Sequence, residues 1–208
     1  MIQLETVVIS ANKNETNRLE APIVVHVMTP KLFENTNSVC LAQGLSFQPG
    51  LRVETNCQNC GFQQVRINGL DGPYTQLLLD GKALFSSLNG VYVIEQIPTG
   101  MIERVEVMRG GGSALYGANA IGGTVNIITK EPLNNLFMIS HNLTAIGNSA
   151  YDNTTSLNTS LVNSQRDAGI YLFGTSRHRQ HYDHDGDHFS EIGKLKLTTL
   201  GFRSFYKP

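Results

Sequence analysis

The pattern of strand-forming segments changes at Glu131–Pro132, and this change constrains the fold more than any other feature of the chain. Before it, strand candidates are short and alternate with glycine turns. After it, they are longer and separated by polar turns, covering residues 136–146, 154–163, 168–177 and 192–206. The sequence therefore predicts an α+β domain with a small mixed sheet and short helices over residues 21–132. Antiparallel up-and-down β-barrel strands are predicted over residues 133–208.

Within the first unit, Ile23–Met28 is a β-branched run, and Thr29–Pro30 marks a turn or a helix start. Apolar spacing predicts a helix over residues 31–45, ended by Gln48–Pro49–Gly50. Further strands are expected beside glycine turns, whose Asn-Gly and Asp-Gly pairs supply the positive φ of tight turns. In order these are Val65–Ile67 before Asn68–Gly69, Gln76–Leu79 before Asp80–Gly81, Ile102–Val107 before the glycine-rich run 109–123, and Thr124–Lys130.

Composition excludes some function classes. The formal net charge is -1 with 16% charged residues, so no basic face for nucleic acid is expected. The apolar runs are far shorter than the roughly 20 residues of a membrane-spanning helix, whereas barrel strands need only about 10 alternating residues. Gly112–Gly117 has the outline of a phosphate loop but lacks the following Lys-Ser/Thr, and no enzyme constellation is visible. The first residues do not resemble a signal peptide, so an exported protein would need a different N-terminus.

The three cysteines are Cys40, Cys57 and Cys60, and the last two form a C-x-x-C. We favour a structural disulfide between Cys57 and Cys60; free thiols, a metal site or a redox centre are the alternatives. No second C-x-x-C is present to complete a zinc site.

The segment 177–188 is rich in histidine and aspartate. Asp183, Asp185 and Asp187 alternate as in calcium-binding loops, and they are the candidate metal ligands, with calcium as the possible ion. However, His188 and Lys194 stand where an EF-hand would have glycine and glutamate. A transition metal or haem bound by the histidines is a further alternative. We favour a solvated hairpin loop.

Several segments in the expected order resemble the plug domain of TonB-dependent outer-membrane receptors. They are Gln64–Gly69, Leu78–Gly81, Ile97–Gly110 and Ser113–Lys130. Gly111 departs from the family pattern, in which proline is frequent at that place. The residues of this chain that match the plug motif are Arg66, Gly69, Asp80, Gly81, Glu103, Arg104, Glu106, Arg109, Gly110, Tyr116, Gly117, Gly122, Gly123 and Asn126.

The resemblance implies a gate rather than an enzyme. Residues 1–20 would be a flexible leader whose segment Glu5, Thr6, Val7, Val8 and Ile9 resembles the TonB box, the handle that TonB binds. Residues 21–132 would be the plug, and residues 133–208 about four strands of an incomplete barrel in outer-membrane lipid. In the family, charges such as Glu103, Arg104, Glu106 and Arg109 sit in the barrel lumen and bond to its wall, and we favour this over a solvated face.

The transported ligand implied by the resemblance is haem, an iron complex or cobalamin, and Asn56–Phe62 is similar to haem-receptor plugs. Two other functions stay open. One is a stand-alone plug-like module that binds ligand or TonB without transport. The other, of a different class, is a redox or metal-binding protein that uses Cys57, Cys60 and the His/Asp loop.

Overall fold

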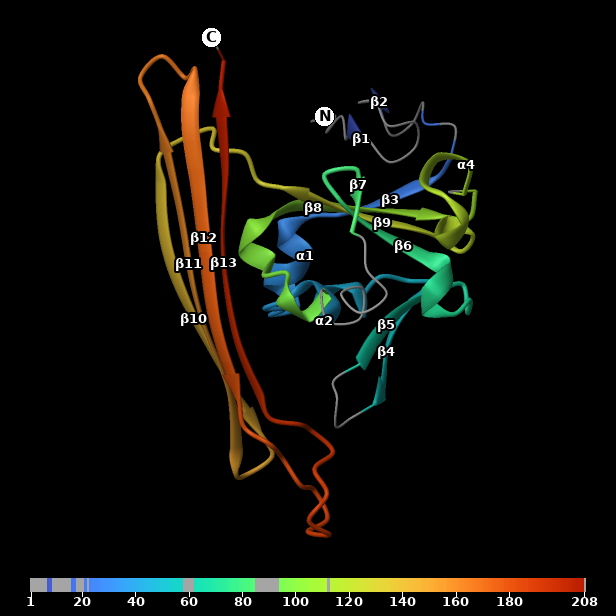
Figure 1. Cartoon of the computed structure of the whole chain (residues 1–208). Helices are drawn as coiled ribbons and strands as arrows, with labels where there is room; N and C mark the ends of the chain where they lie inside the picture. The colour runs from blue at the N-terminus through green and yellow to red at the C-terminus, as the bar shows by residue number, and fades with distance from the viewer. Residues whose placement is uncertain are drawn as a thin grey trace.

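The computed structural model describes residues 7–8, 16–17, 21, 23–57, 62–84, 94–111 and 113–207. An N-terminal α+β unit lies beside a tall curved sheet formed by the C-terminal strands (Figure 1). We call the first the N-terminal unit and the second the wall. The predicted fold class, an α+β unit followed by antiparallel up-and-down strands, is therefore confirmed, while the boundary after Pro132 stays a prediction.

The N-terminal unit is built on a mixed sheet, which in the described residues has the strand order β3-β8-β9-β6-β7. The strands are β3 (Val25–Met28), β6 (Thr75–Leu79), β7 (Lys82–Ala83), β8 (Ile102–Arg109) and β9 (Gly123–Thr129). β6 and β9 run parallel and the other neighbours are antiparallel. Every residue of β9 is buried, which explains its β-branched and small side chains.

Short elements cover this sheet. They are helices α1 (Pro30–Asn35), α2 (Leu41–Leu45) and α4 (Ser113–Tyr116) and the 3-10 turns η1 (Gly72–Tyr74), η2 (Thr99–Met101) and η3 (Ala118–Ala120). The antiparallel pair β4 (Leu51–Cys57) and β5 (Phe62–Ile67) projects from the unit, and β1 (Val7–Val8) pairs with β2 (Thr16–Asn17).

The single helix predicted over residues 31–45 is wrong. Helix α1 ends at Asn35, and Asn37 has a φ of 54°, which takes the backbone out of the helix before α2 begins. The apolar residues that suggested one helix are nevertheless buried together, because Phe33, Leu41 and Leu45 all enter one core. That core lies between the two short helices and the sheet strands β8 and β9, and full burial of each such side chain contributes roughly 1.5–3 kcal/mol.

The wall consists, in the described residues, of β10 (Leu136–Ile146), β11 (Ala150–Val162), β12 (Ala168–Arg179) and β13 (Leu195–Tyr206), paired antiparallel in chain order. β10 has the predicted bounds. β11 begins earlier than predicted, because only residues 147–149 are needed for the turn that precedes it. β13 begins later than predicted, because Ile192 forms a bridge with Tyr182 in the long β12–β13 loop.

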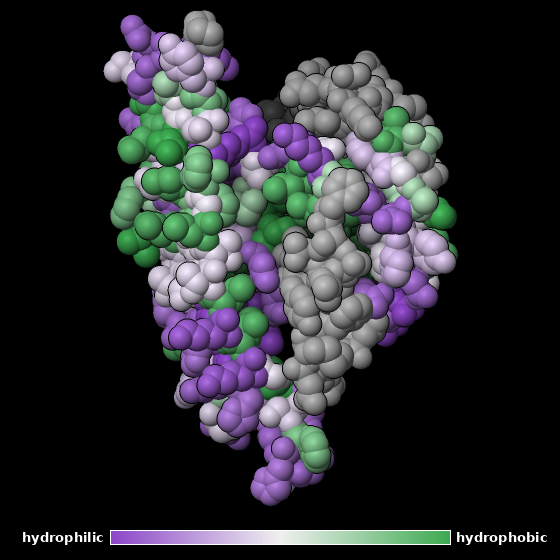
Figure 2. Space-filling model, in the orientation of Figure 1, coloured by the Kyte–Doolittle hydropathy of each residue, from purple (hydrophilic) through white to green (hydrophobic). Residues whose placement is uncertain are grey.

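Along β11, polar side chains are buried and apolar side chains are exposed, the reverse of the pattern in a sheet of a water-soluble protein. Asp152, Thr154, Asn158 and Ser160 are buried toward the N-terminal unit, whereas Tyr151, Leu157 and Leu161 are exposed. Figure 2 shows hydrophobic residues gathered over the upper part of the wall strands. Among the described residues, no helix is long and apolar enough to span a membrane.

Candidate functional site at the interface of the two units

Polar side chains of the wall strands reach across to the N-terminal unit at several heights. Strand alternation places Tyr171, Arg177 and Arg179 of β12 on one face, because residues two apart on a strand point the same way. β13 adds Thr199 and Arg203 on the same side of the wall. These residues make most of the side-chain hydrogen bonds between the two units, while Phe173 of β12 packs against the core of the N-terminal unit, so the interface combines polar contacts with one apolar contact.

Arg177 is the most deeply buried charge of the interface, with 3% of its side chain exposed. On the wall it is held by Asp152: Nε donates to both carboxylate oxygens at 3.0 and 3.1 Å, and Nη2 donates to Oδ2 at 2.6 Å. Toward the N-terminal unit its Nη1 donates to Glu95 Oε1 at 3.4 Å and points at Cys40 Sγ at 3.6 Å. A buried charge needs such partners, because an unpaired one is costly.

Arg179, two residues after Arg177 on β12, contacts the same Glu95 carboxylate. Its Nη1 lies 3.4 Å from Glu95 Oε1, while its Nε donates to the Gly193 carbonyl at 3.1 Å. Two wall arginines thus converge on one oxygen of Glu95. Burial raises the pKa of the neighbouring Cys40 thiol, although the positive charge of Arg177 lowers it in part.

A second contact joins β12 and β11 to the turn η2. The Tyr171 hydroxyl donates to the Gly100 carbonyl at 2.7 Å and lies 3.0 Å from Asn158 Oδ1. A Cβ placed on Gly100 would lie 2.6 Å from Asn158 Oδ1, closer than real Cβ atoms come. Glycine at this position therefore lets the N-terminal unit approach the wall closely.

A third contact lies on β13. Arg203 Nη1 donates to the Thr129 carbonyl at 2.9 Å and lies 3.5 Å from both carboxylate oxygens of Asp80. Its Nη2 donates to Glu131 Oε1 at 2.6 Å. Arg203 therefore bridges the end of β9 to the residues that connect it with the wall.

The predicted role of the β8 charges, contacts with the barrel wall, stays a prediction, and the structure shows these partners within the N-terminal unit. Glu106 is fully buried inside the N-terminal unit and accepts a bond from Arg104 Nε at 2.8 Å, while Arg109 Nη2 donates to the Pro49 carbonyl. Glu103 is exposed. Neither Arg104 nor Arg109 has a contact with the wall among those of the described residues.

Two other predicted residues, Asp80 and Asn126, have clear structural roles. Asp80 Oδ1 accepts from the Thr129 amide at 2.9 Å, and its Oδ2 accepts from the Thr129 hydroxyl at 2.7 Å. Asn126 Oδ1 accepts from the amide of Gly81 at 2.9 Å. Both tie the β6–β7 turn to β9, and Asp80 also lies beside Arg203.

The glycine of Gly123 is required by its surroundings. Its φ is +142°, and a Cβ there would lie 2.2 Å from the Met108 carbonyl oxygen. The amide of Gly110 donates to the carbonyl of Gly122 at 2.9 Å, which closes the glycine-rich run onto the start of β9. These motif glycines shape the unit and lie away from the wall contacts.

The remaining predicted plug residues are distributed around the N-terminal unit. Arg66 Nε pairs with Glu54 at 2.6 Å and its Nη2 with Asp71 at 3.1 Å. Burial and, to a smaller extent, the charge of Glu106 raise the pKa of Tyr116. Gly69 and Gly117 have positive φ, which glycine adopts without strain. The structure therefore does not bring the motif residues into one site.

Two predictions fall largely outside the described residues. Cys57 ends β4 but Cys60 is not described, so the disulfide stays a prediction. In the TonB-box segment, Glu5, Thr6 and Ile9 lie outside the described residues, while Val7 and Val8 form β1.

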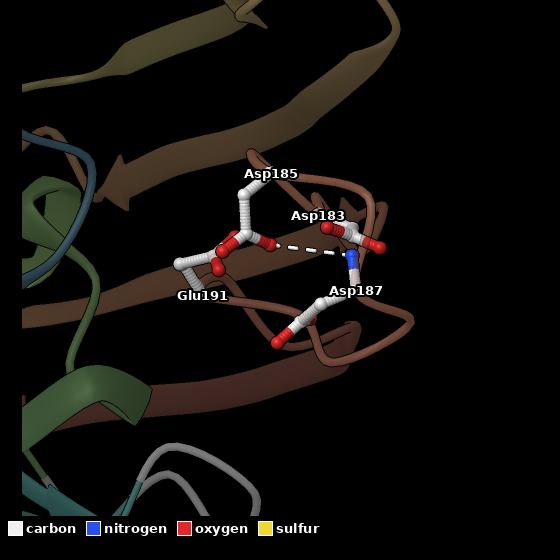
Figure 3. Close-up of side chains that lie close together, drawn as sticks. All are labelled: Asp183, Asp185, Asp187 and Glu191. Carbon is white, nitrogen blue, oxygen red and sulfur yellow. Dashed lines mark hydrogen bonds between the residues drawn. The ribbon is translucent and has the colours of Figure 1, made fainter.

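Asp183, Asp185 and Asp187 do come together at the β12–β13 loop, with Glu191 as a fourth member (Figure 3). One carboxylate oxygen from each lies within 4.8 Å of the others. Several of these oxygens already accept loop amides: Gly186 N donates to Asp183 at 2.7 Å and His184 N to Glu191 at 2.6 Å. Calcium at this loop stays a prediction. Comparison with the EF-hand drew attention to Lys194, and Glu191 was missed.

The interface residues Glu95, Asp152, Arg177 and Arg203 were also missed. The two arginines of β12 are two residues apart, a spacing that puts cations on one strand face, and this signal was present in the sequence. Glu95 carries no such signal, because its partners come from distant strands.

Comparisons with known proteins add to this geometry. The sequence model described as the TonB-dependent receptor plug domain matches residues 17–124. The vitamin B12 transporter BtuB of Vibrio vulnificus is 35% identical over 127 residues, which is 61% of this chain and 21% of that protein. This chain therefore spans about a fifth of the length of that relative.

Two solved structures share the fold. The siderophore receptor PirA from Acinetobacter baumannii superimposes with a TM-score of 0.71 at 23% identity, over 88% of this chain and 29% of that chain. The ferric yersiniabactin uptake receptor FyuA from Yersinia pestis gives 0.66 at 18% identity, over 96% of this chain and 30% of that chain. The likeness extends through the N-terminal unit and the wall together.

Proposed function

This chain belongs to the TonB-dependent receptor plug family, and from that premise we propose that it is the gate and adjoining wall of an outer-membrane uptake receptor. Residues 21–132 are the plug, and residues 133–208 are strands of the barrel that surrounds it. The intact receptor imports cobalamin or an iron–siderophore complex with energy delivered by TonB. Haem remains an alternative ligand, and the receptor acts as a transporter rather than an enzyme.

The observation that carries this proposal is the inverted alternation of the wall. β11 turns Asp152, Thr154, Asn158 and Ser160 toward the plug and Leu157 and Leu161 away from it. Strands of transmembrane barrels alternate in this way, with a polar lumen and an apolar band against lipid. The plug lies on one side of the wall (Figure 1), and it is the side to which the polar residues turn, which supports a plug inside a lumen and an outer face in membrane lipid.

Similarity to BtuB supports cobalamin, and the two solved receptors support ferric siderophores as the ligand class. The polar plug–wall contacts suit a gate, because water can replace hydrogen bonds of this kind when the plug moves.

We place the TonB contact at residues 5–9. Val7–Val8 is extended and pairs with Thr16–Asn17, so this segment already adopts the conformation in which a partner adds as a strand. β1 lies at the end of the molecule opposite the long β12–β13 loop (Figure 1). This arrangement supports a periplasmic partner at one end and an extracellular loop at the other.

Uptake of labelled cyanocobalamin and of labelled ferric siderophores by cells that express the full-length receptor tests the function. We expect TonB-dependent accumulation of one of them, and loss of accumulation with retained surface binding when residues 5–9 are deleted. A cysteine at position 7 should crosslink to TonB, whereas one at the exposed position 24 should not. Accumulation that persists without TonB would contradict the proposal.

A further inference from the structure

We propose that Glu95 is the positioning residue that holds the plug against the wall, and that the plug separates from the wall at this carboxylate. This inference rests on the gate function proposed above and says where the gate opens. Asp152, Arg177 and Arg179 belong to the wall, and Glu95 and Cys40 belong to the plug.

On the wall side, hydrogen bonds within the wall hold both arginines independently of the plug. Three bonds of 2.6–3.1 Å join Arg177 to Asp152, and a 3.1 Å bond joins Arg179 Nε to the Gly193 carbonyl. A guanidinium held in this bidentate way is oriented as well as neutralised. The wall therefore presents two preorganised donors at one point.

On the plug side, Glu95 is also fixed. It lies in a helical turn at residues 94–96 between the buried side chains of Ile94 and Ile97. The amide of Leu41 donates to the Ile97 carbonyl at 2.9 Å, and Cys40 bridges to Pro98. The segment that carries Glu95 and the start of α2 are therefore one body within the plug.

The contact between the two sides is weaker than the contacts within each. Both arginines reach Glu95 Oε1 at 3.4 Å, near the outer limit for a hydrogen bond, whereas Arg177 holds Asp152 at 2.6 Å. When the two sides separate, Arg177 keeps its carboxylate partner Asp152 and Arg179 keeps its bond to the Gly193 carbonyl, so neither guanidinium is left without an acceptor. The contacts of Glu95 with Arg177 and Arg179, which we call the junction, therefore break first, and both arginines keep their partners within the wall.

Cys40 is a natural reporter of this step. Its thiol is 2% exposed and lies 3.6 Å from Arg177 Nη1, so it is shielded while the plug is seated. Separation at Glu95 takes Arg177, the wall side chain that covers the thiol, away from it. The rate at which iodoacetamide alkylates Cys40 therefore measures opening of the junction.

The experiment compares Cys40 alkylation in the full-length receptor in outer membranes, quantified by mass spectrometry of the Cys40 peptide. Glu95→Gln keeps the shape and removes the charge, and we expect it to raise the rate about fivefold. Glu131→Gln is the matched control, because Glu131 pairs with Arg203 elsewhere on the interface. This control should leave the Cys40 rate unchanged.

Charge reversal separates positioning from a merely structural role. Glu95→Lys should raise the rate further than Glu95→Gln, and adding Arg179→Glu should return it toward the wild-type value, because the pair is restored with opposite sign. An unchanged rate in Glu95→Gln, or no rescue by Arg179→Glu, overturns the inference.

Failure of the two proposals can be told apart. Absent uptake by the wild-type receptor would reject the function while the Cys40 rates still report the seated plug. Normal uptake with Cys40 rates that are insensitive to position 95 would reject only the junction.

Discussion

The hydroxyl of Tyr171 on wall strand β12 donates a hydrogen bond to the carbonyl of Gly100 in the plug, across 2.7 Å. Tyr171→Phe removes this bond and leaves the carbonyl without that donor, so we expect a loss of about 1 kcal/mol in plug–wall stability. Denaturant unfolding of the full-length receptor measures it. Tyr206→Phe, at an exposed ring on β13, is the control and should have no effect. Equal stability of both variants would count against the contact.

Gly100→Ala tests the close approach of the two units. The new Cβ would lie 2.6 Å from Asn158 Oδ1, and we expect destabilisation of roughly 1–3 kcal/mol because the side chain of Asn158 must move. Asn158→Ala in the same chain should recover part of that loss. Unfolding midpoints of the single and double variants decide: purely additive effects would show that the two residues do not meet.

Gly123→Ala should prevent the plug from folding normally. The obstruction is the Met108 carbonyl at 2.2 Å from the new Cβ, and this is backbone that cannot rotate away. Gly174→Ala on the wall is the matched control, since the nearest atom there lies at 3.4 Å and the φ is not positive. The measurement is resistance of the plug to added protease; similar protection of both variants would refute the expected difference.

Cys40 should make stability depend on alkaline pH. Burial raises its pKa in the folded state above the ordinary value of about 8.5, so the folded state favours the neutral thiol. This contribution to stability is fully present below the ordinary value and is lost as pH rises toward the raised one. Unfolding free energy measured between pH 8 and 9.5 should therefore fall less steeply in Cys40→Ala than in wild type. The window stops there because Tyr116, whose pKa is also raised, contributes above about pH 10.

Local patterns predicted most of the strands and tight turns. Turn pairs such as Asp80–Gly81 and the alternation along 136–146 report conformation within a few residues, and both correspond to observed elements. The helix over 31–45 was wrong because apolar spacing describes which residues are buried, not whether the backbone between them is continuous. Asn37 breaks that continuity with a positive φ.

The interface could not be predicted in the same way. Glu95 and Arg177 are far apart in the sequence and meet only because the wall lies against the plug, so no short-range pattern encodes their pairing. The motif charges drew attention instead, yet Glu106 is buried within the plug beside Arg104. A motif identifies which family a chain belongs to, whereas the pairing of charges depends on how two units are placed.

The pairing of Val25 with Met108 affects the order in which the strands of the plug can pair during synthesis. Among the described strands, β3 has β8 as its one neighbour, and β8 in turn needs β9, which ends at Thr129. Contacts between residues so far apart in sequence form slowly, because a long loop must close first. During synthesis from the N-terminus, β3 therefore has no β8 to pair with until most of the plug sequence has been made.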